Sequence, residues 1–271
     1  MTTFQKVIKY LAVALAIFLI VTIIGGIITG LSSVSYLLSG RDEALVGQMK
    51  TYGIDEEISD LSIDLSGAEL IIQTGDEFCV ESNHKYINVN AHQGKLRIHE
   101  TKKVFGVSPQ GVTVILTIPK GFVFDKASID TGAGKVSVDT LSCDVLKLSL
   151  GAGRAEIHDL TANSRARIDG GAGELVIDGG KLRNLDFDMG VGALKLKSRI
   201  EGDSELDYGV GETNLILLGS RDDYRIKIDK GIGEAKLEGQ PMRDDSVYGG
   251  GEHRIDIDGG IGAICIEFAQ N

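Results

Sequence analysis

Short segments in which apolar and polar residues alternate, separated by glycine, occupy most of the chain after residue 56. They precede the glycines at 146–150 (LKLSL), 166–169 (ARID) and 185–189 (LDFDM), and follow them at 136–138 (VSV), 175–177 (LVI) and 194–196 (LKL). Alternation with a period of two, bounded by glycine, is typical of half-buried strands. No stripe with the period of a helix follows residue 45. The pattern therefore predicts an all-β fold.

The glycines form G-x-G turns that recur along the chain. The turn glycines are Gly132 and Gly134, Gly151 and Gly153, Gly171 and Gly173, Gly190 and Gly192, Gly209 and Gly211, Gly231 and Gly233, and Gly260 and Gly262. The first five turns are 19 or 20 residues apart, and the last interval contains an insertion at 239–253. An eroded copy, DLSGA, occupies 64–68. Self-similarity at a fixed period is typical of repeat architectures.

Each unit reads as roughly two short strands joined by a glycine corner, and only stacked units can bury their apolar faces. We therefore expect a β-solenoid or stacked-strand fold of about 19–20 residues per coil. It would occupy residues 56–271, with an irregular opening at 56–125 and regular repeats at 126–271. The expected core columns are Ile129, Leu148, Ile168, Phe187, Leu206, Ile228 and Ile257 before the corner, and Val138, Ile157, Ile177, Leu196, Leu215, Leu237 and Ile266 after it. Glycine at the corner indicates a positive φ or a close approach between coils.

Two ligand-binding roles for the turns are excluded by their setting. A nucleotide fingerprint needs a helix after the glycines, and here a strand follows. A calcium β-roll has a nine-residue period and an aspartate where this chain has Leu175 and Ile264.

An aspartate stands two residues before the first glycine of most units. These are Asp130, Asp169, Asp188, Asp207, Asp229 and Asp258, with Asp64 in the eroded copy and Ser149 as the exception. Stacking would place them in an outward ladder of carboxylates. We expect each carboxylate to accept backbone N–H groups of the following turn, as in Asx-turns. The alternative interpretation is a row of cation sites, because Ca²⁺ takes oxygen ligands.

The N-terminus carries a long uncharged stretch from Tyr10 to Gly40. We interpret residues 10–34 as one uncleaved transmembrane helix, since its apolar part has the ~20 residues needed to cross a bilayer. Lys6 and Lys9 precede it, which favours a cytoplasmic N-terminus at 1–9. Residues 35–55 would be a linker, and the repeat domain would lie outside the cytoplasm at the cell membrane.

Composition narrows the function classes. The net charge is −11, which argues against nucleic acid as a partner. The 3 cysteines are widely spaced and form no disulfide framework or zinc motif, and the 5 histidines form no ligand pattern. No nucleophile and base are arranged as in a known catalytic motif. We expect a protein that is not an enzyme and has no cofactor.

The segments VILTIPKG (114–121) and IDTGAGKVSVDTL (129–141), followed by further G-x-G strand repeats, resemble the bacterial putative-adhesin β-strand-repeat family. The resemblance covers residues 55–271. It implies a solenoid-like, extracytoplasmic and non-enzymatic domain, often carried behind one membrane helix, and it transfers no catalytic residues.

Three functions remain open. The first is a membrane-anchored surface for binding or adhesion, whose partner is a protein or a cell-wall or surface polymer. Its exposed rows would include Lys135, Arg154 and Glu174, and Asp139, His158 and Asp178. The second is an envelope-stress or signalling accessory that binds a membrane partner or a cationic peptide. The third is a filament of stacked solenoids, which capping of the last coil by the 239–253 insertion and the polar tail at 269–271 would oppose.

Overall fold

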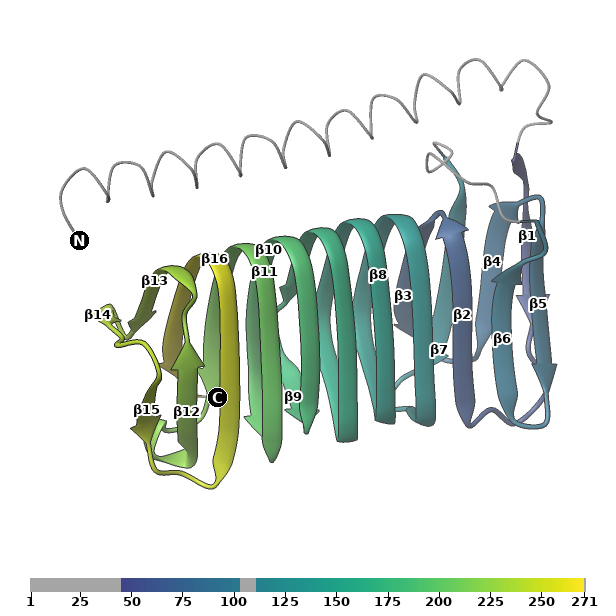
Figure 1. The fold of residues 1–271 in the computed structure, drawn as a ribbon. Helices are drawn as coiled ribbons and strands as arrows, with labels where there is room; N and C mark the ends of the chain where they lie inside the picture. Colours follow the sequence, from purple (N-terminus) through teal and green to yellow (C-terminus); the bar gives the residue numbers. More distant parts are fainter. Residues whose placement is uncertain (1–44, 103–110, 271) are drawn as a thin grey trace, which may run out of the picture. The chain divides into compact units, whose positions relative to one another are not determined.

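The structure, a computed structural model, describes residues 45–102 and 111–270. These residues form an all-β unit in which one 16-stranded sheet is wound into a stack of coils (Figure 1). The predicted transmembrane helix at 10–34 and the cytoplasmic segment at 1–9 lie outside the described residues. Within the described ranges, no helix is long and apolar enough to span a bilayer.

The strands follow one another with short connections. They are β1 (Val46–Gly53), β2 (Asp60–Gly67), β3 (Glu69–Gly75), β4 (Cys79–His84), β5 (Ile87–His92), β6 (Lys95–Glu100), β7 (Thr113–Pro119), β8 (Val123–Ile177), β9 (Gly180–Arg183), β10 (Leu185–Glu201), β11 (Asp203–Leu218), β12 (Tyr224–Asp229), β13 (Ile232–Leu237), β14 (Gln240–Pro241), β15 (Ser246–Gly249) and β16 (His253–Ala269). A 3-10 turn, η1 (Arg221–Asp223), precedes β12. The 55-residue β8 runs through successive coils of the stack.

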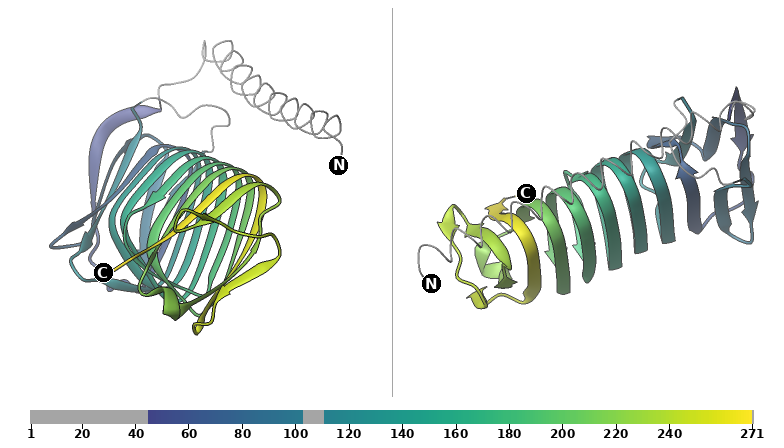
Figure 2. Two further views of the ribbon diagram at one scale, coloured as in Figure 1. Left: turned by 90° about the vertical axis from the view of Figure 1, so that its left-hand side faces the viewer. Right: turned by 45° about the horizontal axis from the view of Figure 1, so that its top comes forward.

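Neighbouring coils pair in parallel and in register, so equivalent residues of the repeat lie side by side. Phe187 of β10 lies opposite Ile168 of β8 and Leu206 of β11. Every residue of the two predicted core columns is buried, with at most 5% of its surface exposed. A view along the stack shows the coils lying almost over one another (Figure 2). The predicted solenoid-like repeat is confirmed.

Each coil also has a third buried side that the two-strand interpretation did not include. Leu160 pairs with Gly180 of β9, and Leu182 of β9 pairs with Ile200 of β10. Leu160, Leu182 and Ile200 are fully buried. These segments alternate over only a few residues, which is why they were not recognised as a separate column.

At both ends of the stack the coils do not follow chain order. The coil of β2 and β3 lies between that of β6 and β7 and the first coil of β8. At the other end, β16 lies between β11 and the coil of β12 and β13 (Figure 1). Parallel pairing in register requires only that equivalent residues of two coils align. A coil that comes later in the chain can therefore insert between two coils that come earlier.

Two expectations are corrected by this arrangement. The segment 35–55 is not a linker throughout, because β1 pairs antiparallel with β4 although its side chains are mostly exposed. The last coil of the sequence is not the last in space, so the C-terminal residues do not cap the stack. Instead β14 and β15, from the insertion, pair antiparallel with β13 and β12 at that end.

Candidate functional site

The corner glycines are required by the close stacking of the coils. A Cβ atom added to Gly211, whose φ is +150°, would lie 1.7 Å from the carbonyl oxygen of Gly192 in the neighbouring coil. At the first glycine of the same turn, Gly209, it would lie 2.2 Å from the oxygen of Gly190. A positive φ and a close approach between coils, the two reasons for glycine expected from the sequence, therefore both apply at this corner. The G-x-G turns are structural.

The aspartates before the corner form the predicted outward ladder. Asp188 lies opposite Asp169 and Asp207, and Asp258 lies opposite Asp207 and Asp229. At the N-terminal end, Asp130 lies opposite Asp64. We call the outward side chains of these strand segments the pre-corner face, and those of the segments after the corner the post-corner face.

The expected Asx-turn explains only one member of the ladder. The backbone N–H of Gly231 donates to Asp229 over 3.2 Å. Asp169 instead accepts from Arg167 over 3.0 Å and from the hydroxyl of Ser149 over 3.5 Å. The carboxylates of Asp130, Asp188, Asp207 and Asp258 accept no hydrogen bond from the described part of the chain. Most of the ladder is therefore not fixed by the turns.

Three adjacent coils toward the β12 end of the stack, those of β10, β11 and β16, concentrate carboxylates on the pre-corner face. We call this set the acidic patch: Asp186, Asp188, Glu205, Asp207, Asp256 and Asp258. Only Asp186 forms an ion pair within the described residues, at 2.9 Å from Arg167. A groove of about 570 Å³ runs beside the patch and is lined partly by Asp186, Glu205 and Asp256.

Charge repulsion within the acidic patch is visible at its centre. Burial raises the pKa of Asp207, and the neighbouring charges of Asp258, Asp188 and Asp186 raise it further. Carboxylate oxygens of Glu205, Asp207 and Asp258 lie within 4.8 Å of one another. Among the described residues, these three carboxylates form the group whose spacing would allow a metal ion to bind. All three side chains are exposed, and three carboxylates are fewer than the 6–8 oxygen ligands that Ca²⁺ takes. They fit a weak cation contact better than a calcium cage.

The post-corner face differs because its charges neutralise one another. Arg154 pairs with Glu156 and with Glu174, and Lys195 lies 3.4 Å from Asp178. Asp139 accepts a hydrogen bond from Thr74 over 2.7 Å. His158 is exposed, as expected. The charged side chains of the mixed rows suggested from the sequence therefore pair mainly with one another.

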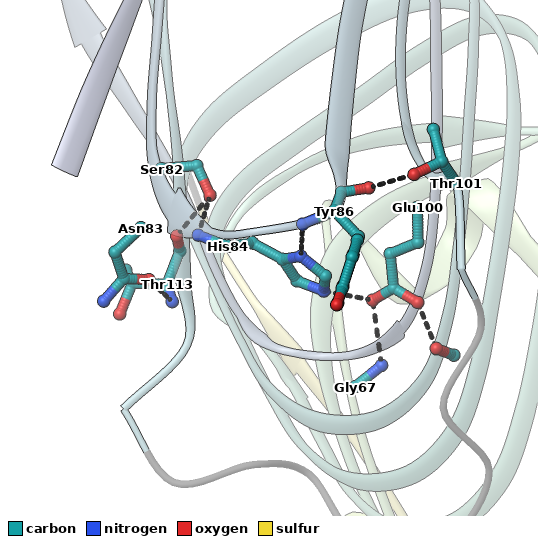
Figure 3. A network of polar contacts seen from close by, with 9 residues as sticks. Gly67, Ser82, Asn83, His84, Tyr86, Glu100, Thr101 and Thr113 are labelled. Carbon is teal, nitrogen blue, oxygen red and sulfur yellow. Dashed lines mark hydrogen bonds and ion pairs between the residues drawn. The ribbon is translucent and has the colours of Figure 1, made fainter. Parts of the chain in front are cut away.

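A buried polar network lies at the N-terminal end of the stack (Figure 3). The Nε2 atom of His84 lies 3.4 Å from Oε1 of Glu100, and both residues are buried. The backbone N–H of Tyr86 donates to Nδ1 of His84 over 3.0 Å, which leaves Nε2 to donate to the carboxylate. Glu100 also accepts from the Ser66 hydroxyl and from the backbone of Gly67.

Glu100 completes a corner that has no regular coil beyond it. Burial pushes the pKa of Glu100 upward, but hydrogen bonds from His84, Ser66 and Gly67 outweigh this and hold the pKa below its usual value. The repeat pattern did not predict the pair of His84 and Glu100, which joins β4 and β6, two strands that do not pair directly. The signal in the sequence was an ionisable side chain at a position that the alternation predicts to point inward. In β6 these inward positions are Leu96, Ile98 and then Glu100.

The cysteines form no disulfide. Cys79, Cys143 and Cys265 are all free thiols. Burial raises the pKa of Cys143 to about 12, with a smaller contribution from Asp144, so this thiol is unreactive at neutral pH. None of the three belongs to the metal-binding group found in the described residues.

Several solved structures are similar to this chain. A structure from Clostridium sporogenes ATCC 15579, described as a "putative cell adhesion protein", is 16% identical, with a TM-score of 0.34, and the match covers 82% of this chain and 99% of that one. A "putative adhesin" from Bacteroides fragilis NCTC 9343 is 11% identical, with a TM-score of 0.34 and coverage of 82% and 96%. A "putative lipid binding protein" from Parabacteroides distasonis ATCC 8503 is 15% identical, with a TM-score of 0.42 and coverage of 82% and 97%. Likeness at this level says nothing about the ligand.

No curated protein matches the chain. Residues 58–249 match the protein family described as Toastrack DUF4097. The match covers β2 to β15 and therefore most of the repeat coils, but it ends before β16. The resemblance drawn from the repeat is thereby confirmed, and the chain belongs to the Toastrack DUF4097 family.

Proposed function

We propose that the coil stack is a non-enzymatic binding surface, and that the acidic patch is the part of it that engages a partner bearing lysine or arginine side chains. The observation that carries the proposal is the register of β10, β11 and β16, which aligns six carboxylates in two rows. Five of the six have no ion pair in the described residues. Aligned like charges repel, so an unrelieved cluster fits a cationic surface better than a purely structural role.

Rigid coils favour this function because they fix the spacing of the carboxylates. Adjacent coils are about 4.8 Å apart, and alternate residues along a strand are about 6.6 Å apart. The patch is therefore a preformed array, and binding does not require it to order. Its field would also accelerate the encounter with a cationic partner, most strongly at low salt.

The place of action follows from the sequence and belongs to the proposal. A transmembrane helix at 10–34 with a cytoplasmic N-terminus would display the stack outside the cytoplasm at the cell membrane. The partner would be a protein or a cell-wall or surface polymer that carries positive charge. In this role the protein is an adhesive or docking surface and carries no cofactor.

The acidic patch also fits the alternative, an envelope-stress or signalling accessory that binds a cationic peptide or a membrane partner. The two functions differ in what the anchor must do. A tether tolerates replacement of residues 10–34 by any apolar helix, whereas a signalling helix does not. The filament hypothesis is less favoured, because antiparallel strands flank the first and last coils of the described stack.

In-cell photo-crosslinking tests the proposal. A photoreactive residue would replace Asp203, which is exposed beside the acidic patch, or Glu174 on the post-corner face as the matched control. Capture from position 203 of a cationic protein or polymer that position 174 does not capture would support a binding patch. Equal capture from both positions, or none, would contradict it. Capture of one defined membrane protein would favour the signalling accessory over adhesion.

A further inference from the structure

We propose a second binding site, at the opposite end of the pre-corner face, for the phosphate group of a phosphate monoester or diester. The site is a groove of about 420 Å³ on the outer surface of β5 and β6. We call it the donor groove; it is lined by Asp60, Asn88, Asn90, His92, Gln93, Lys95, Arg97 and His99. It is separate from the acidic patch and does not depend on the function proposed for that patch.

The strand register turns these residues into a compact array. β5 and β6 pair antiparallel, which places His92 opposite Lys95, Asn90 opposite Arg97, and Asn88 opposite His99. Side chains at alternate positions of one strand point to the same face, so all six face outward together. None of the six is acidic.

The chemistry of the array is that of a hydrogen-bond donor surface. A guanidinium, an ammonium and two amides supply donors, and imidazoles can add a donor from either nitrogen. Phosphate oxygens accept several hydrogen bonds at once, and arginine binds them in a bidentate manner. Neutral or cationic partners would gain little from such a surface.

The charges of the groove are available for a ligand. Arg97 is exposed and makes no ion pair with a described residue, in contrast to Arg154 and Arg167 elsewhere on the stack. The one carboxylate in the groove, Asp60, lies between Lys95 and Lys126 in the strand register, so its charge is offset on both sides. Asp64 of the neighbouring coil lies opposite His99 but does not line the groove. The lining itself therefore carries two positive side chains, Lys95 and Arg97, and one carboxylate, in a chain whose net charge is −11.

A further sign is an unsatisfied nitrogen. Nδ1 of His99 is buried and has no hydrogen-bond partner in the described part of the chain. A ligand that reached this nitrogen would supply the hydrogen bond that the fold leaves unmade.

Binding of glycerol 3-phosphate to the full-length chain in a nonionic detergent tests the site. We expect saturable binding by calorimetry, with perturbation of the imidazole NMR signals of His92 and His99 but not of the distant His158. Arg97→Gln should weaken binding about tenfold. Arg225→Gln is the matched control, because Arg225 is also exposed on the pre-corner face and lies in the last coil, opposite Arg254.

A second arm identifies the source of the phosphate. Mixed micelles containing phosphatidylglycerol replace the soluble ligand, with phosphatidylcholine micelles as the reference. Arg97-dependent binding of glycerol 3-phosphate indicates a soluble ligand, and Arg97-dependent binding of phosphatidylglycerol micelles alone indicates a lipid headgroup. Absence of saturable binding to either probe, or equal weakening by Arg97→Gln and Arg225→Gln, would overturn the proposal.

Discussion

The donor groove and the acidic patch lie on the same face of the stack, the groove on the antiparallel pair β5 and β6 and the patch on parallel coils, and they carry opposite charge. In both, outward residues alternate with buried aliphatic ones, and the strand register aligns them between neighbours. The groove presents Arg97 and His99 at the two outward positions where the patch presents Glu205 and Asp207. The backbone therefore sets the spacing of a binding surface, and the residues at two outward positions of each coil decide what it binds.

The two regions also differ inside. Beneath the patch the rings of Phe187 and Tyr208 lie 5.5 Å apart, and the buried hydroxyl of Tyr208 has no hydrogen-bond partner among the described residues. Beside the groove the core ends in the buried pair of His84 and Glu100. An end of the stack has no further coil to satisfy its corner, so a charged side chain takes that place. Single substitutions can separate the contribution of the shared backbone from that of these local differences.

The shared backbone should fail when a corner glycine acquires a side chain. Gly211→Ala places a Cβ where the Gly192 oxygen now lies and forces a φ that alanine rarely adopts, so we expect a loss of about 4 kcal/mol in unfolding free energy. Urea denaturation measures it. Gly250→Ala is the control, because nothing lies within 4 Å of its added Cβ, and it should change stability by less than about 0.5 kcal/mol. Equal effects of the two would show that coil contact does not require glycine.

The buried pair should matter next. His84→Ala removes one of the two side-chain donors to Glu100, the other being Ser66, and leaves a buried carboxylate less well paired, so we expect a loss of about 3 kcal/mol. Glu100→Gln, which keeps the shape and removes the charge, should cost less. Thermal unfolding of the two variants at neutral pH tests this. If His84→Ala were neutral, the pair would not support this end of the stack.

The same pair predicts a specific pH dependence. The folded-state pKa of Glu100 is lowered, so its stabilising contribution is fully present above the unfolded-state pKa, near 4.3, and is lost as pH falls through the folded-state value. The difference in unfolding free energy between wild type and Glu100→Gln should therefore shrink below about pH 4.5. A difference that stays constant from pH 7 to pH 3 would contradict the assignment.

The stability contribution of Asp207 in the acidic patch should change with pH in the opposite direction to that of Glu100. The folded-state pKa of Asp207 is raised, so its carboxylate destabilises the fold above that pKa, and the penalty disappears below the unfolded-state value. Asp207→Asn should stabilise the chain by about 0.5 kcal/mol at pH 7, with the gain vanishing in acid. Calorimetric unfolding at both pH values checks this. A destabilised variant would mean that Asp207 makes a contact within the fold.

The repeat was readable from the sequence because one pattern recurs in every coil. Inward aliphatics, corner glycines and outward aspartates each keep a fixed place in it, so burial of residues such as Phe187 and Leu206 followed from counting. The coil order at the two ends was not readable. β16 presents the same pairing pattern to β11 and to β12, and only the space left between them determines its place.

The candidate sites were predictable only in part, for a related reason. The carboxylate ladder follows from the repeat, but its concentration into a patch depends on a second outward position, at Asp186, Glu205 and Asp256, where other coils carry Ser128 or Arg167. The donor groove required the antiparallel pairing of β5 with β6. The His84–Glu100 contact required two strands that do not pair. Neither the pairing of β5 with β6 nor the contact of His84 with Glu100 leaves a periodic signal in the sequence.

The most direct test of the binding patch compares two triple variants of equal charge. The first neutralises Glu205, Asp207 and Asp258 in the patch, and the second neutralises Glu77, Glu212 and Glu267, exposed carboxylates elsewhere that have no ion pair in the described residues. Affinity of the full-length chain for an oligolysine peptide is measured at low salt. We expect the patch variant to bind at least about tenfold more weakly than wild type, a change of about 1.4 kcal/mol, while the second variant binds nearly as wild type does. Equal weakening of the two variants would show that only net charge matters and would contradict a localised binding surface.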